Sequence, residues 1–199
     1  MKTDVITLSN TGSGIQEALS QTEKAAAFRG LAPKQSLRLR LLAEEMLGML
    51  RTIVGETKSE YWVEAEGNTF QLHLATKAHL YSEMREELLR TSTTGTNAAA
   101  KGFMGKLRDI ITQTLEPSRE GNLPADYGFF YDSYDGIVDP LSEGMLYGWS
   151  LLEYKNAIQA NKDEEDWDEL EKSITANLAD EIRIYIRSSD VEMVIKKAF

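Results

Sequence analysis

Cysteine is absent from the 199-residue sequence, and histidine occurs only twice, at His73 and His79. The lack of cysteine excludes disulfide bonds, thiolate zinc sites and a cysteine nucleophile. Two histidines are too few for a histidine-rich metal centre. No run of about eighteen apolar residues occurs, and the N-terminal sequence MKTDVITLSN lacks the apolar stretch of a signal peptide. We therefore expect a soluble, cytoplasmic protein that does not bind a membrane.

Hydrophobic residues make up 42% of the chain and charged residues 27%, which are ordinary values for a globular protein. The net charge of −10 is unevenly distributed. Residues 116–181 carry a net charge of −13, from 17 acidic and four basic residues, and the remainder carries +3. Such an acidic block repels phosphate backbones, so we expect no nucleic acid partner. The block is either a solvated surface or a docking element for a protein.

The first half of the chain predicts a strand, two helices and a hairpin. Residues 3–9 alternate as a strand does, and Gly30 ends a helix predicted for 14–29. Pro33 begins a longer predicted helix that runs to Val54. That helix carries an apolar stripe at helical spacing, formed by Leu37, Leu41, Leu42, Met46, Met49, Leu50 and Ile53. Two segments of period two flank a tight turn at 66–69, which predicts an antiparallel hairpin of strands 60–66 and 69–76.

The second half of the chain is less regular. Residues 116–145 contain three of the four prolines and are predicted to be irregular. The other expected elements are helices at 80–90, 102–115, 146–161 and 164–179, a loop at 91–100, and strands at 182–187 and 191–197.

Strands with one apolar face and helices gathered on that face predict an α+β fold. We expect a two-layer α/β sandwich in a single domain over 1–199, with a mainly antiparallel sheet and helices on one face. Its body spans 1–115 and 180–199, and residues 116–179 form an acidic, largely helical insertion. The opposite sheet face would carry Trp62, Glu64, His73, Arg183, Tyr185 and Arg187. Because Trp62 and Tyr185 are unusual in open water, we expect the insertion or a second subunit to cover that face; a homodimer is one alternative.

Glu45 lies four residues after Leu41 and four before Met49, which places it on the apolar stripe. A carboxylate directed at a core needs partners or a pocket. Glu45 is therefore either a pocket base or a partly exposed residue at the edge of the stripe. Glu44 lies four residues after Arg40, the spacing of an exposed helical ion pair.

Residues 91–106, TSTTGTNAAAKGFMGK, form a loop of small residues that leads into a predicted helix. Backbone N–H groups at such a helix start suit phosphates, and Lys101 and Lys106 add positive charge. The spacing of Gly102 and Gly105 is common, and no P-loop string is present. A flexible surface loop is the alternative interpretation.

The order of the elements together with these two features resembles the GHKL superfamily of Bergerat-fold ATPases, and most of all its anti-sigma-factor serine kinases. LRLRLLAEEMLGMLRTIV is similar to the family helix that bears a Glu-x-x-x-Asn motif. FQLHLATKA takes the place of the strand with the Asp-x-Gly motif, and TSTTGTNAAAKGFMGKLRDII resembles the lid and the helix that follows it. The resemblance covers about 1–115 and 180–199. It implies ATP with Mg²⁺ as the cofactor.

The resemblance assigns the catalytic position to Glu45, which matches the glutamate that activates water or the acceptor hydroxyl. Met49 stands where the family has its magnesium-binding asparagine. A thioether is a poor ligand for Mg²⁺, which prefers oxygen. No metal ligand is therefore assigned to this chain.

The nucleotide-binding positions carry over only in part. Thr76 stands where the family has the aspartate that binds the adenine amino group, and Ala78 stands for the glycine that follows it. Gly102 and Gly105 keep part of the second glycine motif, and Lys101 lies beside them. We interpret the chain as a degenerate member of this fold.

Three functions remain open at this stage. The first is a regulatory module that is non-catalytic or binds nucleotide weakly and acts through a protein partner. The second is an active Mg-ATP-dependent serine kinase or ATPase with Glu45 as general base. The third is a binder of another small molecule in the remodelled pocket. We choose the first, because the adenine aspartate and the metal asparagine are both replaced.

Three further features of the sequence have less specific interpretations. Asp132 and Glu143 have the spacing of EF-hand loop ends, but the residues between them do not fit calcium. His73 is interpreted as an ordinary residue of the sheet face. The acidic run 163–169 predicts a helix start. That helix either packs through Trp167, Leu170 and Ile174, which is our preferred interpretation, or uses Trp167 as a docking anchor.

Overall fold

The computed structural model describes residues 1–9, 11–53, 58–77, 103, 105, 107, 129–131, 147–162, 164–187 and 190–199. Its elements in chain order are β1 (Ile6–Ser9), α1 (Ile15–Phe28), α2 (Pro33–Ile53), β2 (Lys58–Glu66), β3 (Thr69–Lys77), β4 (Phe129–Tyr131), β5 (Tyr147–Ser150), α5 (Leu151–Asn161), α6 (Glu164–Lys172), α7 (Ile174–Leu178), β6 (Glu181–Arg187) and β7 (Asp190–Ala198). None of these helices is long and apolar enough to cross a membrane.

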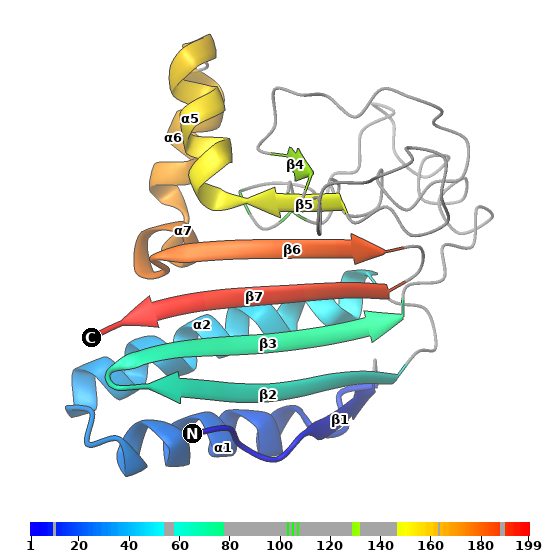
Figure 1. The fold of residues 1–199 in the computed structure, drawn as a ribbon, viewed down its shortest axis with the longest axis vertical. Helices are drawn as coiled ribbons and strands as arrows, with labels where there is room; N and C mark the ends of the chain where they lie inside the picture. The colour runs from blue at the N-terminus through cyan, green and yellow to red at the C-terminus, as the bar shows by residue number, and fades with distance from the viewer. Residues whose placement is uncertain are drawn as a thin grey trace.

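The strands form one sheet in the order β1-β2-β3-β7-β6-β5-β4 (Figure 1). Every neighbouring pair is antiparallel. The C-terminal strand β7 lies in the middle, between β3 and β6, so the last strand of the chain joins the N-terminal hairpin to the rest of the sheet. The predicted hairpin is confirmed, and its turn depends on Gly67, whose φ of 55° is in the region that favours glycine.

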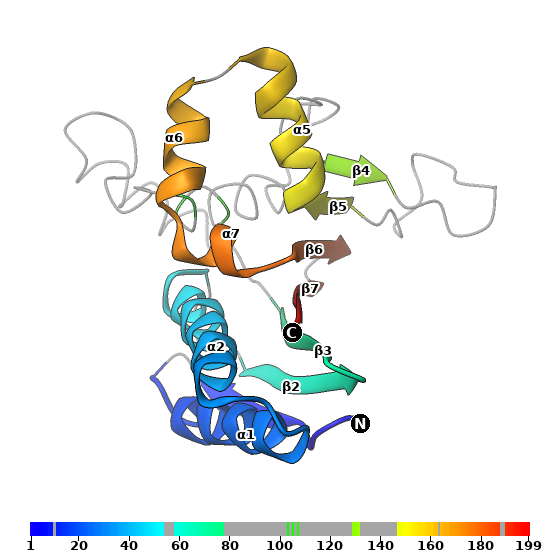
Figure 2. The ribbon, with the colours of Figure 1, turned by 90° about the vertical axis from the view of Figure 1, so that its left-hand side faces the viewer.

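In Figure 2, α2, α6 and α7 lie to the left of the strands, and none of the described helices lies to their right. α2 crosses behind β3 and β7 in the view of Figure 1. The second layer continues beyond α2 because α7 contacts α2, and α5 contacts β5 and β6. The prediction of an α+β sandwich with an antiparallel sheet and helices on one face is therefore confirmed for the described residues.

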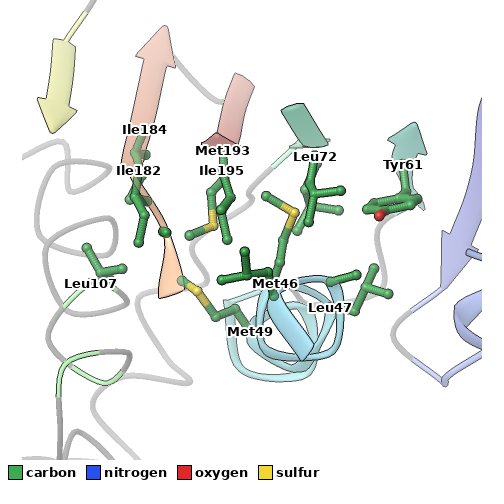
Figure 3. Packing of buried hydrophobic residues seen from close by; sticks show 14 of the residues in the cluster. Met46, Leu47, Met49, Tyr61, Leu72, Leu107, Ile182, Ile184, Met193 and Ile195 are labelled. Carbon is green, nitrogen blue, oxygen red and sulfur yellow. The ribbon is translucent and has the colours of Figure 1, made fainter. Parts of the chain in front are cut away.

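The core lies between α2 and the inward side chains of the strands (Figure 3). Met46 and Met49 of α2 point from the helix toward the strands. The inward side of the sheet consists of alternate, fully or almost fully buried residues, among them Tyr61, Val63, Phe70, Leu72, Ile182, Ile184, Met193 and Ile195. Methionine adapts its shape to irregular gaps, which suits a helix that crosses several strands.

The edge of the sheet at β2 is completed by the first residues of the chain. Met1 exchanges backbone hydrogen bonds with Ala65, and Thr3 donates its N–H to the Val63 carbonyl. Lys2 forms a bridge with Glu64, whereas Ile6 pairs with Tyr61, so the edge segment holds one extra residue between these pairs. Such a bulge ends regular pairing along the edge and places Lys2 beside β2.

The described part of segment 116–179 is mainly helical, in α5, α6 and α7, as predicted, but it also contains strands. Two of its pieces, β4 and β5, are strands that extend the sheet beyond β6. Residues 147–150 were predicted to be helical, and they form β5 instead because they pair with β6, which follows them in the chain. Residues 129–131 were predicted to be irregular and form β4. The described part of the segment therefore continues the sheet rather than covering its second face.

The helix predicted for 164–179 is divided at Ser173, whose side chain accepts a hydrogen bond from the backbone N–H of Ala176 and caps α7. Leu170 is buried and Trp167 packs partly against the core, as expected. Ile174 is 59% exposed, so its predicted role in packing is wrong. The break at Ser173 turns Ile174 away from the face that Leu170 buries.

Gly14→Ala is expected to lower the free energy of unfolding by at least about 2 kcal/mol. Gly14 has a φ of 83°, and an added Cβ would lie 2.5 Å from the carbonyl oxygen of Thr7. Urea unfolding measures the loss.

Gly48→Ala is the matched control, because Gly48 is an exposed position in α2 where an added Cβ meets nothing within 4 Å. This change is expected to stabilise the protein by about 0.5–1 kcal/mol through helix propensity. Equal effects of the two substitutions would contradict the contact between Gly14 and β1.

Candidate functional site

Of the predicted nucleotide-site residues, the structure describes Met49, Thr76 and Gly105. Met49 is 5% exposed and belongs to the core, where its side chain faces the strands (Figure 3). Thr76 lies at the end of β3, and its hydroxyl accepts a hydrogen bond from Ser59 at 2.8 Å across the hairpin. Phe103, Gly105 and Leu107 are helical and buried. Met49 and Thr76 are thus used for packing and pairing within the fold.

Ala78, Lys101 and Gly102 lie outside the described residues, as do the predicted helix 80–90 and the loop 91–100. Asp132 and Glu143 also lie outside them. Their predicted roles therefore stay predictions. Among the residues that the structure does describe, no group of three His, Asp or Glu side chains is placed to hold a metal ion.

Glu45 is exposed, which agrees with the alternative of an exposed residue at the edge of the apolar stripe. The buried face of α2 consists of Leu39, Leu42, Ala43, Met46, Leu47 and Met49. Leu37 is 56% exposed. The buried face is therefore rotated about the helix axis, toward Ala43 and away from Leu37, and Glu45 falls outside it. The role of Glu45 as a base stays a prediction. The expected Arg40–Glu44 ion pair is confirmed, with a distance of 2.9 Å between the charged atoms.

The other side of the sheet carries the side chains that alternate with the buried ones in β2, β3, β7 and β6. We call this surface the open face, since none of the described helices lies over it (Figure 2). Strand pairing sets its side chains in rows across the four strands. One row contains Trp62, His73, Val194 and Arg183, and the next contains Glu60, Ala75, Glu192 and Tyr185.

Trp62 and His73 form the centre of a polar cluster on the open face. Their rings stack with centroids 4.7 Å apart and an angle of 9° between planes. Lys2 lies 4.8 Å from the Trp62 ring centroid and forms an ion pair of 3.0 Å with Glu64. The Trp62 indole N–H donates to the same carboxylate at 3.0 Å. His73 in turn contacts Glu192 of β7. The cluster around Trp62 therefore includes side chains from β2, β3, β7 and the edge segment.

His73 was interpreted as an ordinary residue of the sheet face, but it is only 9% exposed. Its Nδ1 lies 3.0 Å from Glu192 of β7, and its Nε2 lies 4.0 Å from the second carboxylate, Glu64 of β2. Nε2 is buried and has no hydrogen-bond partner among the described residues. The imidazole therefore stands between two carboxylates of neighbouring strands, covered on one face by Trp62.

Hydrogen bonds from Lys2 and Trp62 hold the pKa of the Glu64 carboxyl below its ordinary value, since both favour the ionised form. Glu64 is consequently a permanent negative charge at neutral pH, on a strand whose other outward side chains include Glu60 and Glu66. The outward side chains of β6 carry the opposite sign at Arg183 and Arg187, with Tyr185 between them. The open face is therefore acidic along β2 and basic along β6.

The residues predicted for this face do lie on it, namely Trp62, Glu64, His73, Arg183, Tyr185 and Arg187. Lys2 and Glu192 were not predicted there. The alternation of residues 190–198 places Glu192 outward, but no local pattern shows that β7 lies beside β3. No local pattern shows that Lys2 lies beside β2 at the edge of the sheet.

Comparison of the chain with known protein families, curated proteins and solved structures found no match in any of the three.

Glu64→Gln is expected to lower the free energy of unfolding at pH 7, and its effect is expected to shrink as the pH falls below about 4.5. A carboxyl whose folded-state pKa is lowered stabilises the fold only while it is ionised. Its contribution is present above the ordinary pKa and is lost as the pH falls through the lowered value. Urea unfolding between pH 3 and 7 measures the difference between the two proteins.

Glu60→Gln, on the same strand, is the control, since Glu60 is exposed and lies outside the cluster around Trp62. If the difference between wild type and Glu64→Gln stays constant over the whole pH range, the charge of Glu64 does not stabilise this sheet edge.

Proposed function

We propose that the protein is a non-catalytic regulatory module that binds a protein partner through the open face. The observation that carries this proposal is the one-sided fold, since the described helices cover one face of the sheet (Figure 2). The other face presents Trp62, Tyr185 and paired charges. Aromatic and arginine side chains are enriched in protein interfaces.

Rigidity of the open face supports the same proposal. Its side chains stand on extended strands of seven to nine residues whose pairing is continuous from β2 to β6. Trp62 is held by its stack with His73 and by its hydrogen bond to Glu64. A partner that binds such a preorganised surface loses little side-chain entropy, which favours recognition.

We further propose that the fold is a degenerate relative of the GHKL ATPases. The support is the order of strand, helix, helix, hairpin and terminal hairpin, with helices on one face. The nucleotide chemistry has weaker support. Met49, at the position of the metal ligand, is packed in the core, and Thr76, at the position of the adenine aspartate, is hydrogen-bonded to Ser59. Both observations favour the non-catalytic alternative over an active kinase.

A photo-crosslinking residue at Tyr185 tests the proposed binding surface in cells that express the chain. Tyr185→p-benzoylphenylalanine is expected to form a defined crosslinked species on illumination, because position 185 lies in the open face. The matched control carries the same residue at Glu45, which is exposed in the helical layer. Equal crosslinking from both positions, or none from position 185, would overturn the proposal.

Calorimetric titration with ATP and ADP, with and without Mg²⁺, tests the alternative of an active kinase or ATPase. The proposed function predicts that nucleotide binds weakly at most and independently of Mg²⁺. It also predicts that the binding heat of Glu45→Ala equals that of wild type. Magnesium-dependent binding in the micromolar range that Glu45→Ala alters would instead establish the nucleotide-dependent enzyme. It would also require a metal site without Met49.

A further inference from the structure

We propose that the outer edge of β2 is an acceptor site for an extended, basic segment of a protein partner, and that the edge segment, residues 1–5, occupies this site as a displaceable strap. The inference goes beyond the proposed function, because it concerns backbone pairing at an edge of the sheet. It also names the chemistry of the segment that binds there. The argument comes from the way the edge segment is attached and from the contacts of its lysine.

The outer edge of β2 is paired regularly over only part of its length. β1 pairs with residues 58–61, and among the described residues the edge segment alone accompanies the remaining part, residues 62–66. Pairing is incomplete at Val63, whose backbone N–H donates to the Thr3 hydroxyl at 2.9 Å instead of to a backbone carbonyl. A regular strand in the same place would supply that carbonyl, so the edge can pair better than it does with its own segment.

The edge segment is attached without burying its side chains. Met1 is 42% exposed and Val5 is 50% exposed, and the Lys2 side chain is exposed as well. The hydrophobic core begins at Ile6, the first residue of β1. Because opening the edge segment exposes little apolar surface, it costs far less free energy than unfolding of the whole sheet.

Gln21 of α1 sets the point at which the edge segment can hinge. Its side-chain amide donates to the Thr3 hydroxyl and to the Asp4 carbonyl, each at 2.8 Å. Asp4 lies at the bulge, where the edge segment holds one residue more than β2. Residues 1–3 can therefore leave β2 while Asp4 stays with α1 and β1 stays paired.

Lys2 shows which kind of side chain the site accepts. Its ammonium lies 4.8 Å from the centroid of the Trp62 ring and 3.0 Å from the Glu64 carboxylate. Trp62 keeps its place without this lysine, since His73 stacks on the ring and Glu64 accepts the indole N–H. An aromatic ring fixed beside a carboxylate is a preorganised site for a cation, and Lys2 is its occupant within the chain.

The neighbouring outward side chains of β2 extend the preference for positive charge. Glu60 and Glu66 lie on the same side of the strand as Trp62 and Glu64. A strand that pairs with this edge places every second side chain beside that row. In strand addition, main-chain hydrogen bonds provide affinity and alternate side chains provide specificity. The segment that fits is therefore extended and carries lysine or arginine at alternate positions.

A fluorescent peptide of sequence Lys-Thr-Lys-Thr-Lys, blocked at both ends, tests the acceptor site by fluorescence anisotropy. Because the edge segment competes with this probe, Lys2→Ala is expected to lower the Kd of the probe by about five- to tenfold. Glu64→Lys is expected to raise that Kd by at least about tenfold, since it places a like charge beside a lysine of the probe. The same peptide with glutamate in place of lysine is expected not to bind.

The matched controls make the same changes of charge elsewhere on the protein. Lys34→Ala in α2 is the control for Lys2→Ala, and Glu164→Lys in α6 is the control for Glu64→Lys, since both positions are exposed. Each control is expected to leave the Kd of the probe unchanged. Equal effects of Lys2→Ala and Lys34→Ala would overturn the proposal, because the probe would then respond only to net charge. So would a Lys2→Ala protein that does not bind the probe at about 5 mM.

Hydrogen exchange measures the opening of the edge segment directly and without the probe. The backbone N–H groups of Val63 and Ala65 both donate to this segment. They are expected to exchange at least about 100-fold faster than the N–H of Leu72 in β3, and faster still in Lys2→Ala. Equal exchange rates at Val63 and Leu72 would show that the segment opens only when the sheet unfolds, which would overturn the strap.

These results separate the inference from the proposed function. If the probe fails to bind but position 185 still crosslinks to another protein, the acceptor site at β2 is excluded and the open face stands as a binding surface. If the probe binds as expected and position 185 forms no crosslink, the acceptor site stands and the open face does not.

Discussion

Burial of a single face of the sheet against α2 is the interaction on which the rest of this structure depends. The strands supply alternate buried residues from β2 to β6, and α2 supplies the helical surface that covers them, with Met46, Leu47 and Met49 filling the space between. Removing this apolar area from water is the main favourable contribution to folding. Because the described helices cover only one face, the other must be stabilised by different means.

Polar contacts supply that stabilisation on the open face. The stack of Trp62 and His73, with Lys2, Glu64 and Glu192 around it, connects the edge segment, β2, β3 and β7. Lys2 and Glu192 are 190 residues apart in the chain, so this cluster exists only in the folded protein. It keeps a tryptophan at the surface in one orientation and satisfies much of the polarity around it. A rigid aromatic group among fixed charges loses little side-chain entropy when a partner binds.

The hairpin and α2 show how far local patterns carry. The period of two on either side of Gly67 predicts β2, β3 and their register, because the turn fixes which residues face each other. α2 was predicted within one residue at its end, yet the buried face of the helix is rotated from the predicted stripe. Leu39 and Ala43 belong to the buried face although they lie outside the predicted stripe, whereas Glu45 is exposed. A helix pattern predicts that one face is buried, but the angle at which the helix crosses its sheet selects the residues.

β5 is an element that local sequence patterns did not predict. Residues 147–150 lead directly into α5 and are too few to show a period of two. They form a strand because they pair with β6. The sequence by itself determined the α+β class, the N-terminal elements and the alternation that divides each strand into a buried and an outward side. These follow from local propensity and period. Only the tertiary structure decided that β7 stands between β3 and β6 and that the acidic segment lengthens the sheet. It also decided that the acidic side chains of β2 and the basic side chains of β6 flank the same face. Those outcomes depend on pairings between residues far apart in the chain, which no local pattern encodes.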